Sequence, residues 1–150
     1  MSAPRAIVIG CSAGGMRALK EVLSKLRSDV GAPILAVCHT GSEDVTTLCE
    51  LIGASSTVPV REARERCRAH DNTVYIAPGG YHLLVEYGGR MSLSVDERVA
   101  FARPAIDVLF ESAADVYGHE LVGIVMTGAN HDGAQGLLRI RQRRGIGHAE

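Results

Sequence analysis

The sequence has no strong excess of either charge. Sixteen Lys and Arg side chains stand against seventeen Asp and Glu, and the 150-residue chain has a formal net charge of −1. Proteins held to nucleic acid or anionic membranes by long-range attraction are basic, so we expect neither partner here. The local exception is a short basic cluster that we interpret as a solvated helix face: Arg139, Arg141, Arg143 and Arg144.

Other absences narrow the class of protein. The four cysteines form no CxxC pair and show no disulfide-framework spacing, so we expect reduced thiols in a cytoplasmic protein. Beyond His39, the histidines lack paired ligand spacing, and we expect no metal and no cofactor. Signal-peptide features and bilayer-length apolar runs are also missing, so membrane insertion is not expected. These properties indicate one globular cytoplasmic domain.

Short apolar runs alternate with helical patterns along the chain. Strands are predicted at 6–9, 34–38, 58–60, 74–77 and 121–126, and helices at 16–26, at 43–51, from Pro104 onward and from near Gly133. This βαβ alternation predicts an α/β fold with a parallel sheet covered on both faces. An inserted β-hairpin is expected from 83–87 and 91–95, joined through Gly88-Gly89.

Three loops follow the carboxyl ends of predicted strands, at 10–15, 39–41 and 127–133. In an open parallel sheet these ends share one edge, where ligands bind at a topological switch point. The loops offer Ser12 as a nucleophile, His39 as general base and acid, and Asp132 to orient the imidazole. We therefore predict a Ser12–His39–Asp132 triad.

An oxyanion would be stabilised by backbone N–H groups near the nucleophile. The glycines at 14 and 15 allow a carbonyl to approach the chain, and the following helix begins with unpaired N–H donors. Ala13 N–H is the first candidate donor, and the Gly128-Ala129 loop offers a second, at Ala129.

Other interpretations of the same residues remain open. A glycine-rich loop between strand and helix also suits an anion- or nucleotide-binding α/β domain, although the Walker Lys and a full GxGxxG are missing. Cys11 paired with His39 would make a cysteine nucleophile. Because neighbours on an extended segment point apart, Cys11 and Ser12 cannot both face the base, and we favour Ser12.

Five segments, in this order, resemble the catalytic domain of the chemotaxis protein-glutamate methylesterases, the CheB family. They are 7–15, the strand ending in His39, 74–82, 103–110 and 126–134. The resemblance implies the same triad, Ser12, His39 and Asp132. It also implies a doubly wound, mostly parallel sheet with helices on both faces. Arg103-Pro104 and the 78–82 loop would frame the active-site mouth, and we leave them off the catalytic list.

The resemblance implies an enzyme that hydrolyses glutamate γ-methyl esters on chemoreceptor cytoplasmic helices, with glutamine deamidation as a related activity. Its partner would be the methylated receptor. Because the chain begins at the first esterase strand, regulation would need a separate receiver or kinase protein.

Two departures from the family pattern leave a second hypothesis, a catalytically silent receptor-binding or regulatory module. The His loop reads His39-Thr-Gly41, where the family usually has His-Met or His-Leu followed by prolines. Residues 142–150 are more polar than a core strand should be. We therefore expect residues 1–150 to be one methylesterase-like catalytic domain that lacks the family's last strand and helix.

Overall fold

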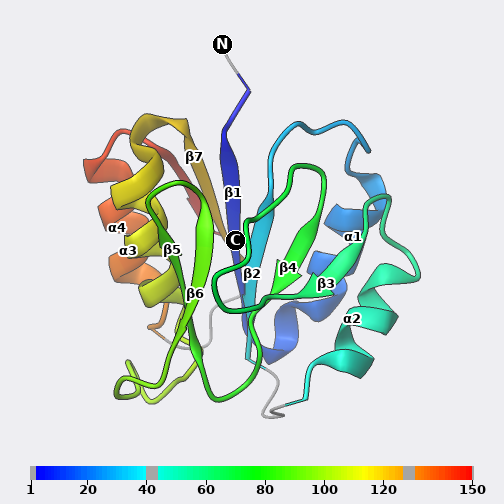
Figure 1. Ribbon diagram of the computed structural model, residues 1–150, viewed down its shortest axis with the longest axis horizontal. Helices are drawn as coiled ribbons and strands as arrows, with labels where there is room; N and C mark the ends of the chain where they lie inside the picture. The colour runs from blue at the N-terminus through cyan, green and yellow to red at the C-terminus, as the bar shows by residue number, and fades with distance from the viewer. Residues whose placement is uncertain (1–2, 40–43, 127–130, 150) are drawn as a thin grey trace.

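The computed structural model describes residues 3–39, 44–126 and 131–149. Figure 1 shows the elements along the chain. The strands of the main sheet are β1 (Ala6–Cys11), β2 (Ile34–Cys38), β3 (Val60–Glu62), β4 (Val74–Ile76), β7 (Leu121–Met126) and β8 (Ile146–Ala149). The hairpin strands are β5 (His82–Glu86) and β6 (Arg90–Ser94), and the helices are η1 (Ala13–Gly15), α1 (Met16–Lys25), α2 (Thr46–Gly53), α3 (Ile106–Tyr117), η2 (Gly118–Glu120) and α4 (Ala134–Gln142).

The main sheet has the strand order β3-β4-β2-β1-β7-β8. Every neighbouring pair in it runs parallel, which confirms the predicted parallel α/β sheet. From β1 the chain winds outward first through β2 and later, on the other side, through β7. The topological switch point therefore lies between β1 and β7.

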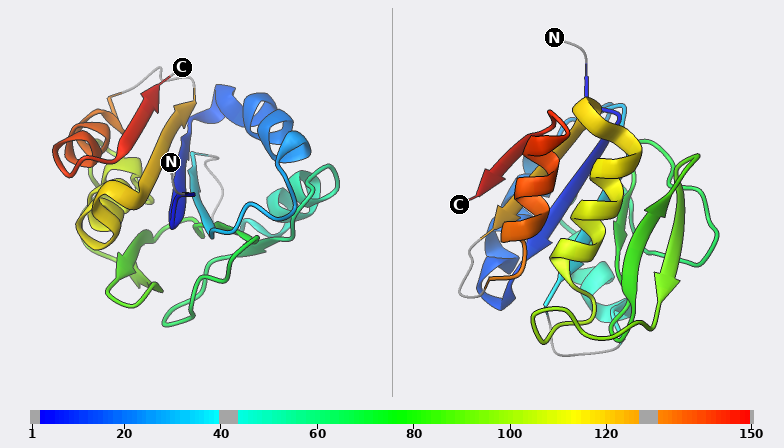
Figure 2. Two further views of the ribbon diagram at one scale, coloured as in Figure 1. Left: turned by 90° about the horizontal axis from the view of Figure 1, so that it is seen from above. Right: turned by 90° about the vertical axis from the view of Figure 1, so that its left-hand side faces the viewer.

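Helices cover both faces of this sheet, as Figure 2 shows from two directions. Alternate side chains of β1 point to opposite faces of the sheet, as they do along any strand. Ile9 and Cys11 are buried with α1 and α2, whereas Ala6 and Val8 are buried with α3, α4 and the hairpin. The fold is the doubly wound arrangement that the resemblance implied.

The inserted hairpin forms where the sequence predicted it. β5 and β6 pair antiparallel through a turn at Gly88 and Gly89, whose φ angles of 90° and 79° favour glycine. Val85 N–H donates to Ser112 Oγ of α3 at 3.0 Å, which fixes the hairpin against that helix.

Several predicted boundaries were displaced. The strand expected at 58–60 is β3, at 60–62, because pairing with β4 begins at Val60 while Val58 is buried in the core. The helix expected from Pro104 begins at Ile106, after a cis Arg103–Pro104 bond and an extended N-cap residue, Ala105. The helix expected at 43–51 is α2, at 46–53.

A strand forms after α4, in residues whose polarity had argued against one. Residues 146–149 form β8, which pairs in parallel with β7 and makes one edge of the sheet. An edge strand has one neighbour and tolerates polar residues, and Ile146 is half exposed. Arg141 Nη2 of α4 donates to Gly147 O at 3.1 Å and holds the strand to the helix before it. Within the described ranges, no helix is long and apolar enough to cross a membrane.

Candidate active site

His39 and Asp132, far apart in the sequence, are in direct contact at the carboxyl edge of the sheet. His39 Nε2 lies 2.9 Å from Asp132 Oδ2. The Asp132 side chain is fully buried, and the His39 side chain keeps 18% of its surface exposed. A buried carboxylate thus holds one ring nitrogen, and the imidazole still reaches the surface.

The beginning of α3 fixes the Asp132 carboxylate. Ile106 N–H donates to Asp132 Oδ2 at 2.6 Å, and Asp107 N–H donates to Oδ1 at 2.8 Å. These N–H groups have no partner inside the helix, so a carboxylate at this point satisfies them and faces the positive end of the helix dipole.

This arrangement sets the tautomer of His39. An ionised carboxylate only accepts hydrogen bonds, so the proton between His39 and Asp132 belongs to His39 Nε2. In the neutral ring Nδ1 then carries the free electron pair. His39 is therefore oriented to accept a proton at Nδ1.

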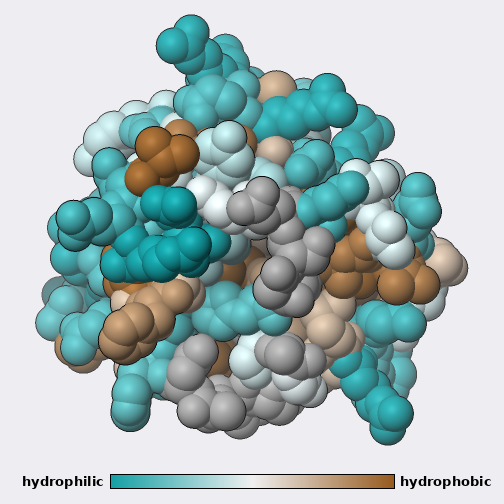
Figure 3. All heavy atoms as spheres, turned by 90° about the horizontal axis from the view of Figure 1, so that it is seen from below, coloured by the Kyte–Doolittle hydropathy of each residue, from teal (hydrophilic) through white to brown (hydrophobic). Residues whose placement is uncertain are grey.

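Ser12 lies just past the end of β1, the strand next to the one that leads to His39. Cys11 and Cys38 are the last register pair of β1 and β2, and His39 N–H continues the ladder by donating to Cys11 O at 2.9 Å. Ser12 directly follows Cys11 and His39 directly follows Cys38, and neighbouring strands lie about 4.8 Å apart. With Asp132 in the loop after β7, all three predicted residues lie on the edge that Figure 3 shows from below.

The backbone after Ser12 turns directly into a helix. Ser12 has extended dihedrals, with φ −78° and ψ 173°, and its carbonyl accepts from Gly15 N–H at 2.8 Å to open η1. The N–H groups of Ala13 and Gly14 come before the first bond of this turn and have no intrahelical partner. The other predicted donor, Ala129, lies outside the described residues.

Cys11 is in the wrong place for a nucleophile. Its side chain is fully buried in the layer beneath α1, with Sγ 3.9 Å from Met16 Sδ. The Asp132 carboxylate lies at the start of α3, on the opposite face of the sheet. The cysteine-nucleophile interpretation is therefore contradicted.

Asp107 supports the site and was missed as a functional residue. Its Oδ1 accepts from Gly133 N–H at 2.9 Å and from Gly136 N–H at 2.8 Å, at the start of α4. Burial raises the pKa of Asp107, and the nearby Asp132 charge adds to this, while hydrogen bonds from Gly136 and Gly133 oppose it. Its sequence signal was its place within the 103–110 segment that resembles the family, and the contact itself depends on tertiary structure.

His82 is a buried structural residue beside the site. It is 1% exposed, and its Nε2 lies 2.8 Å from Glu97 O while Ala105 N–H donates to its Nδ1 at 3.2 Å. Since Nδ1 accepts, Nε2 carries the proton and donates to the carbonyl. With both nitrogens used, His82 joins two ends of the 97–105 loop and positions the residues that lead into α3.

The described residues hold no metal site, and a sizeable cavity lies away from this edge. Across residues 3–39, 44–126 and 131–149, no group of three or more His, Cys, Asp or Glu could hold a metal ion. A cavity of about 840 Å³ is lined by Arg5, Gly31 and Tyr117, among others, at the amino ends of the strands. The predicted triad residues, Ser12, His39 and Asp132, lie at the opposite ends of the strands.

The sheet is open and parallel, a serine follows one of its strands, and a histidine bonded to a buried carboxylate lies near the switch point. This is the architecture of an α/β hydrolytic enzyme. Residues 7–150 match the sequence model of a family described as CheB methylesterase, and the chain belongs to that family.

Curated relatives and a solved structure agree with this assignment. A putative protein-glutamate methylesterase/protein-glutamine glutaminase of Leptospira interrogans is 44% identical over 141 residues, covering 94% of this chain and 73% of its own. The corresponding protein of Symbiobacterium thermophilum is 39% identical over 97% of this chain, which spans only 40% of that relative. The CheB methylesterase catalytic domain of Thermotoga maritima superposes with a TM-score of 0.91 at 29% identity, covering 98% of this chain and 79% of that one.

Proposed function

We propose that residues 1–150 form a catalytic domain that hydrolyses glutamate γ-methyl esters on chemoreceptor cytoplasmic helices, with Ser12, His39 and Asp132 as its triad. The single observation that supports this most directly is the 2.9 Å contact between His39 Nε2 and the buried Asp132 carboxylate. Family membership and the names of the relatives supply the substrate class.

The first half of the reaction forms an acyl-enzyme. His39 Nδ1 takes the Ser12 hydroxyl proton as Ser12 Oγ attacks the ester carbonyl carbon. The imidazolium that forms is stabilised by Asp132 through Nε2–H. Collapse of the tetrahedral intermediate breaks the C–OCH₃ bond, and the methoxy oxygen leaves as methanol with the proton from His39.

The second half regenerates the serine. A water molecule loses a proton to His39 Nδ1 and attacks the acyl carbon. Breaking the bond to Ser12 Oγ returns that proton to the serine and releases the glutamate carboxylate. Glutamine deamidation follows the same route, except that ammonia leaves in the first half.

Backbone donors would hold the oxyanion in both halves. Ala13 N–H fits the part because it directly follows the nucleophile and has no intrahelical partner. Ala129 N–H remains the proposed second donor. One such donor is worth about 10²–10³ in kcat in serine hydrolases.

The partners are proposals of the same kind. The methylated receptor would be the substrate, and a receiver or kinase protein would regulate this domain. Several full-length relatives are more than twice as long as this chain, which spans 40% of the Symbiobacterium protein. The activity is therefore proposed for the catalytic domain alone.

Methanol release from a methylated receptor cytoplasmic fragment tests the proposal. The wild-type chain should release methanol, Ser12→Ala should release none, and Ser24→Ala, which changes an exposed serine of α1, should match the wild type. Receptor binding without methanol release by the wild type would instead support the silent regulatory module. Turnover by Ser12→Ala would exclude Ser12 as the nucleophile.

A further inference from the structure

A tight turn near the site presents an aromatic side chain to solvent. Val99 N–H donates to Ala102 O at 3.0 Å, and Ala102 N–H donates to Val99 O at 2.9 Å. Between them, Ala100 and Phe101 have φ angles of 50° and 66°. Such a turn normally uses Asn or Gly at both positions, and a bulky residue there is strained.

Phe101 gains no burial in return for this conformation. Its side chain is 97% exposed, whereas Phe110, the chain's other phenylalanine, is fully buried. Other exposed apolar side chains lie on or beside the same loop: Val95 at 67%, Tyr81 at 42% and Val99 at 37%. Strained residues that the fold itself does not need are concentrated at functional sites.

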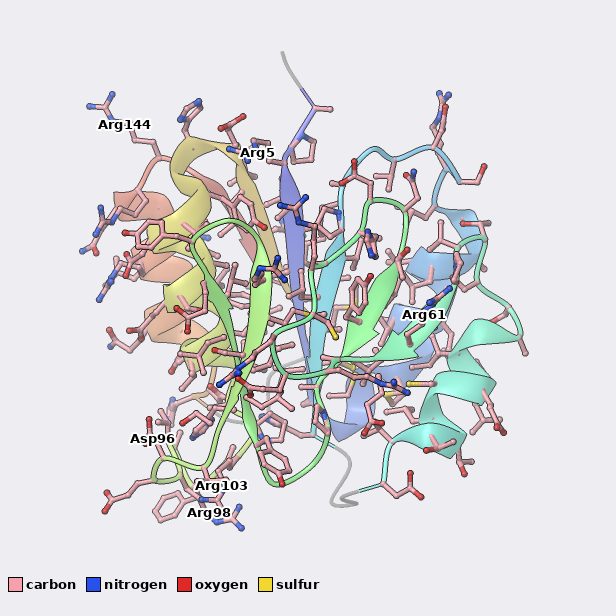
Figure 4. All side chains as sticks on the ribbon, in the orientation of Figure 1. Arg5, Arg61, Asp96, Arg98, Arg103 and Arg144 are labelled. Atoms are coloured by element: carbon pink, nitrogen blue, oxygen red, sulfur yellow. The ribbon has the colours of Figure 1, made fainter. Side chains whose placement is uncertain are left out.

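The loop is fixed to the catalytic edge of the molecule. Buried His82 connects Glu97 O with Ala105 N, and Arg103 O accepts from Gly80 N–H at 3.1 Å. The residue after Ala105 is Ile106, whose N–H holds Asp132. Figure 4 shows the labelled Asp96, Arg98 and Arg103 together at the lower left, at the carboxyl ends of the strands.

The turn at Phe101 lies within reach of a helical substrate bound at the triad. Phe101 precedes Ile106 by five residues, so the backbone between them spans at most about 17 Å. A helix of roughly eleven residues covers that length. A receptor helix that carries the ester is therefore long enough to contact Phe101 while its ester lies at the triad.

We propose that residues 95–103, with Phe101 at the tip, are a docking surface for the helix that carries the methyl ester, contacting apolar side chains within about three turns of the esterified glutamate. This inference rests on the proposed function. Continuity with the site favours a substrate helix over a second copy of this chain. The charges of the loop balance, Asp96 and Glu97 against Arg98 and Arg103, so it lacks the basic excess that an anionic lipid surface attracts.

Steady-state kinetics of Phe101→Ser on two substrates provide the test. With a methylated receptor fragment, KM should rise about tenfold or more, because a desolvated aromatic anchor typically contributes that much to binding. With p-nitrophenyl acetate, kcat/KM should stay at the wild-type value. Phe101→Leu should restore most of the receptor KM.

Tyr87→Ser is the matched control, because Tyr87 is an aromatic residue that is 81% exposed at the other hairpin turn, near the amino ends of the strands. It should leave both substrates unaffected. An unchanged receptor KM in Phe101→Ser overturns the proposal, as does an equal loss on both substrates. The proposal is also overturned if Phe101→Ser leaves receptor turnover unchanged but alters the oligomeric state or the binding to phosphatidylserine vesicles. If the wild type itself leaves receptor esters intact, the proposed function fails instead.

Discussion

Asp132 and Asp107 cap each other's helices. The Asp132 carboxylate, just before α4, accepts from the first N–H groups of α3, while Asp107, in the first turn of α3, accepts from Gly133 and Gly136 at the start of α4. The two helices are thereby joined at the point where the His39 contact is made. The position of Asp132, the proposed triad aspartate, therefore depends on a second buried carboxyl group, that of Asp107.

The raised pKa of Asp107 should make the stability of the folded protein depend on pH. Because burial and the neighbouring Asp132 charge raise the pKa of Asp107, the folded protein binds its proton more tightly than the unfolded chain does. The contribution of Asp107 to stability is present below its ordinary pKa and is lost as pH rises through the raised value.

Asp107→Asn keeps an amide oxygen for the N–H groups of α4 and removes the ionisation. Relative to wild type, its free energy of unfolding should therefore be higher, meaning a more stable variant, at pH 7 than at pH 4, as measured by urea denaturation. The exposed control Asp96→Asn should show no such difference. A relative stability of Asp107→Asn that is constant with pH would contradict the assigned role.

Gly10 keeps β1 in contact with α3. A Cβ at this position would lie 2.5 Å from Ile106 Cγ2, on the residue whose N–H holds Asp132. Gly10→Ala should therefore destabilise the fold by about 1–3 kcal/mol and also lower kcat, by displacing Asp132.

Gly53→Ala is the control for that substitution. An alanine Cβ at position 53 would lie 3.6 Å from Val60, an ordinary van der Waals contact. Gly53 is in helix α2, where alanine is preferred over glycine by about 0.5–1 kcal/mol. Thermal unfolding and esterase assays of both variants give the comparison. A Gly10→Ala protein as stable and active as the wild type would show that the close packing is unimportant.

The cysteines should be dispensable for catalysis. Cys67 is exposed, Cys11 and Cys38 are buried, and burial, the largest cause, raises the pKa of Cys49 to about 11. Because the thiolate is the reactive form, iodoacetamide at pH 8 should label Cys67 first and leave activity intact. Peptide mass mapping together with an activity assay checks this. Activity lost in step with labelling of Cys11 would revive the cysteine-nucleophile interpretation.

Sequence patterns predicted the sheet, because β-branched runs that end in glycine identify buried parallel strands. They also placed Ser12, His39 and Asp132 on one edge, since the carboxyl ends of such strands must meet there. They missed β8, whose polar residues suit an edge strand and not a core strand. They missed Asp107 as well, because its role depends on two helices meeting, which neither periodicity nor loop position reveals.

Fluorophosphonate labelling tests the central claim, that the His39–Asp132 pair activates Ser12, because only an activated serine reacts rapidly. The modified residue is located by mass spectrometry and the rate is followed over time. The wild type should be labelled at Ser12, and His39→Ala should slow labelling by a factor on the order of 10³ or more. Equal labelling rates in the wild type and His39→Ala, or wild-type labelling no faster at Ser12 than at the exposed Ser24, would contradict it.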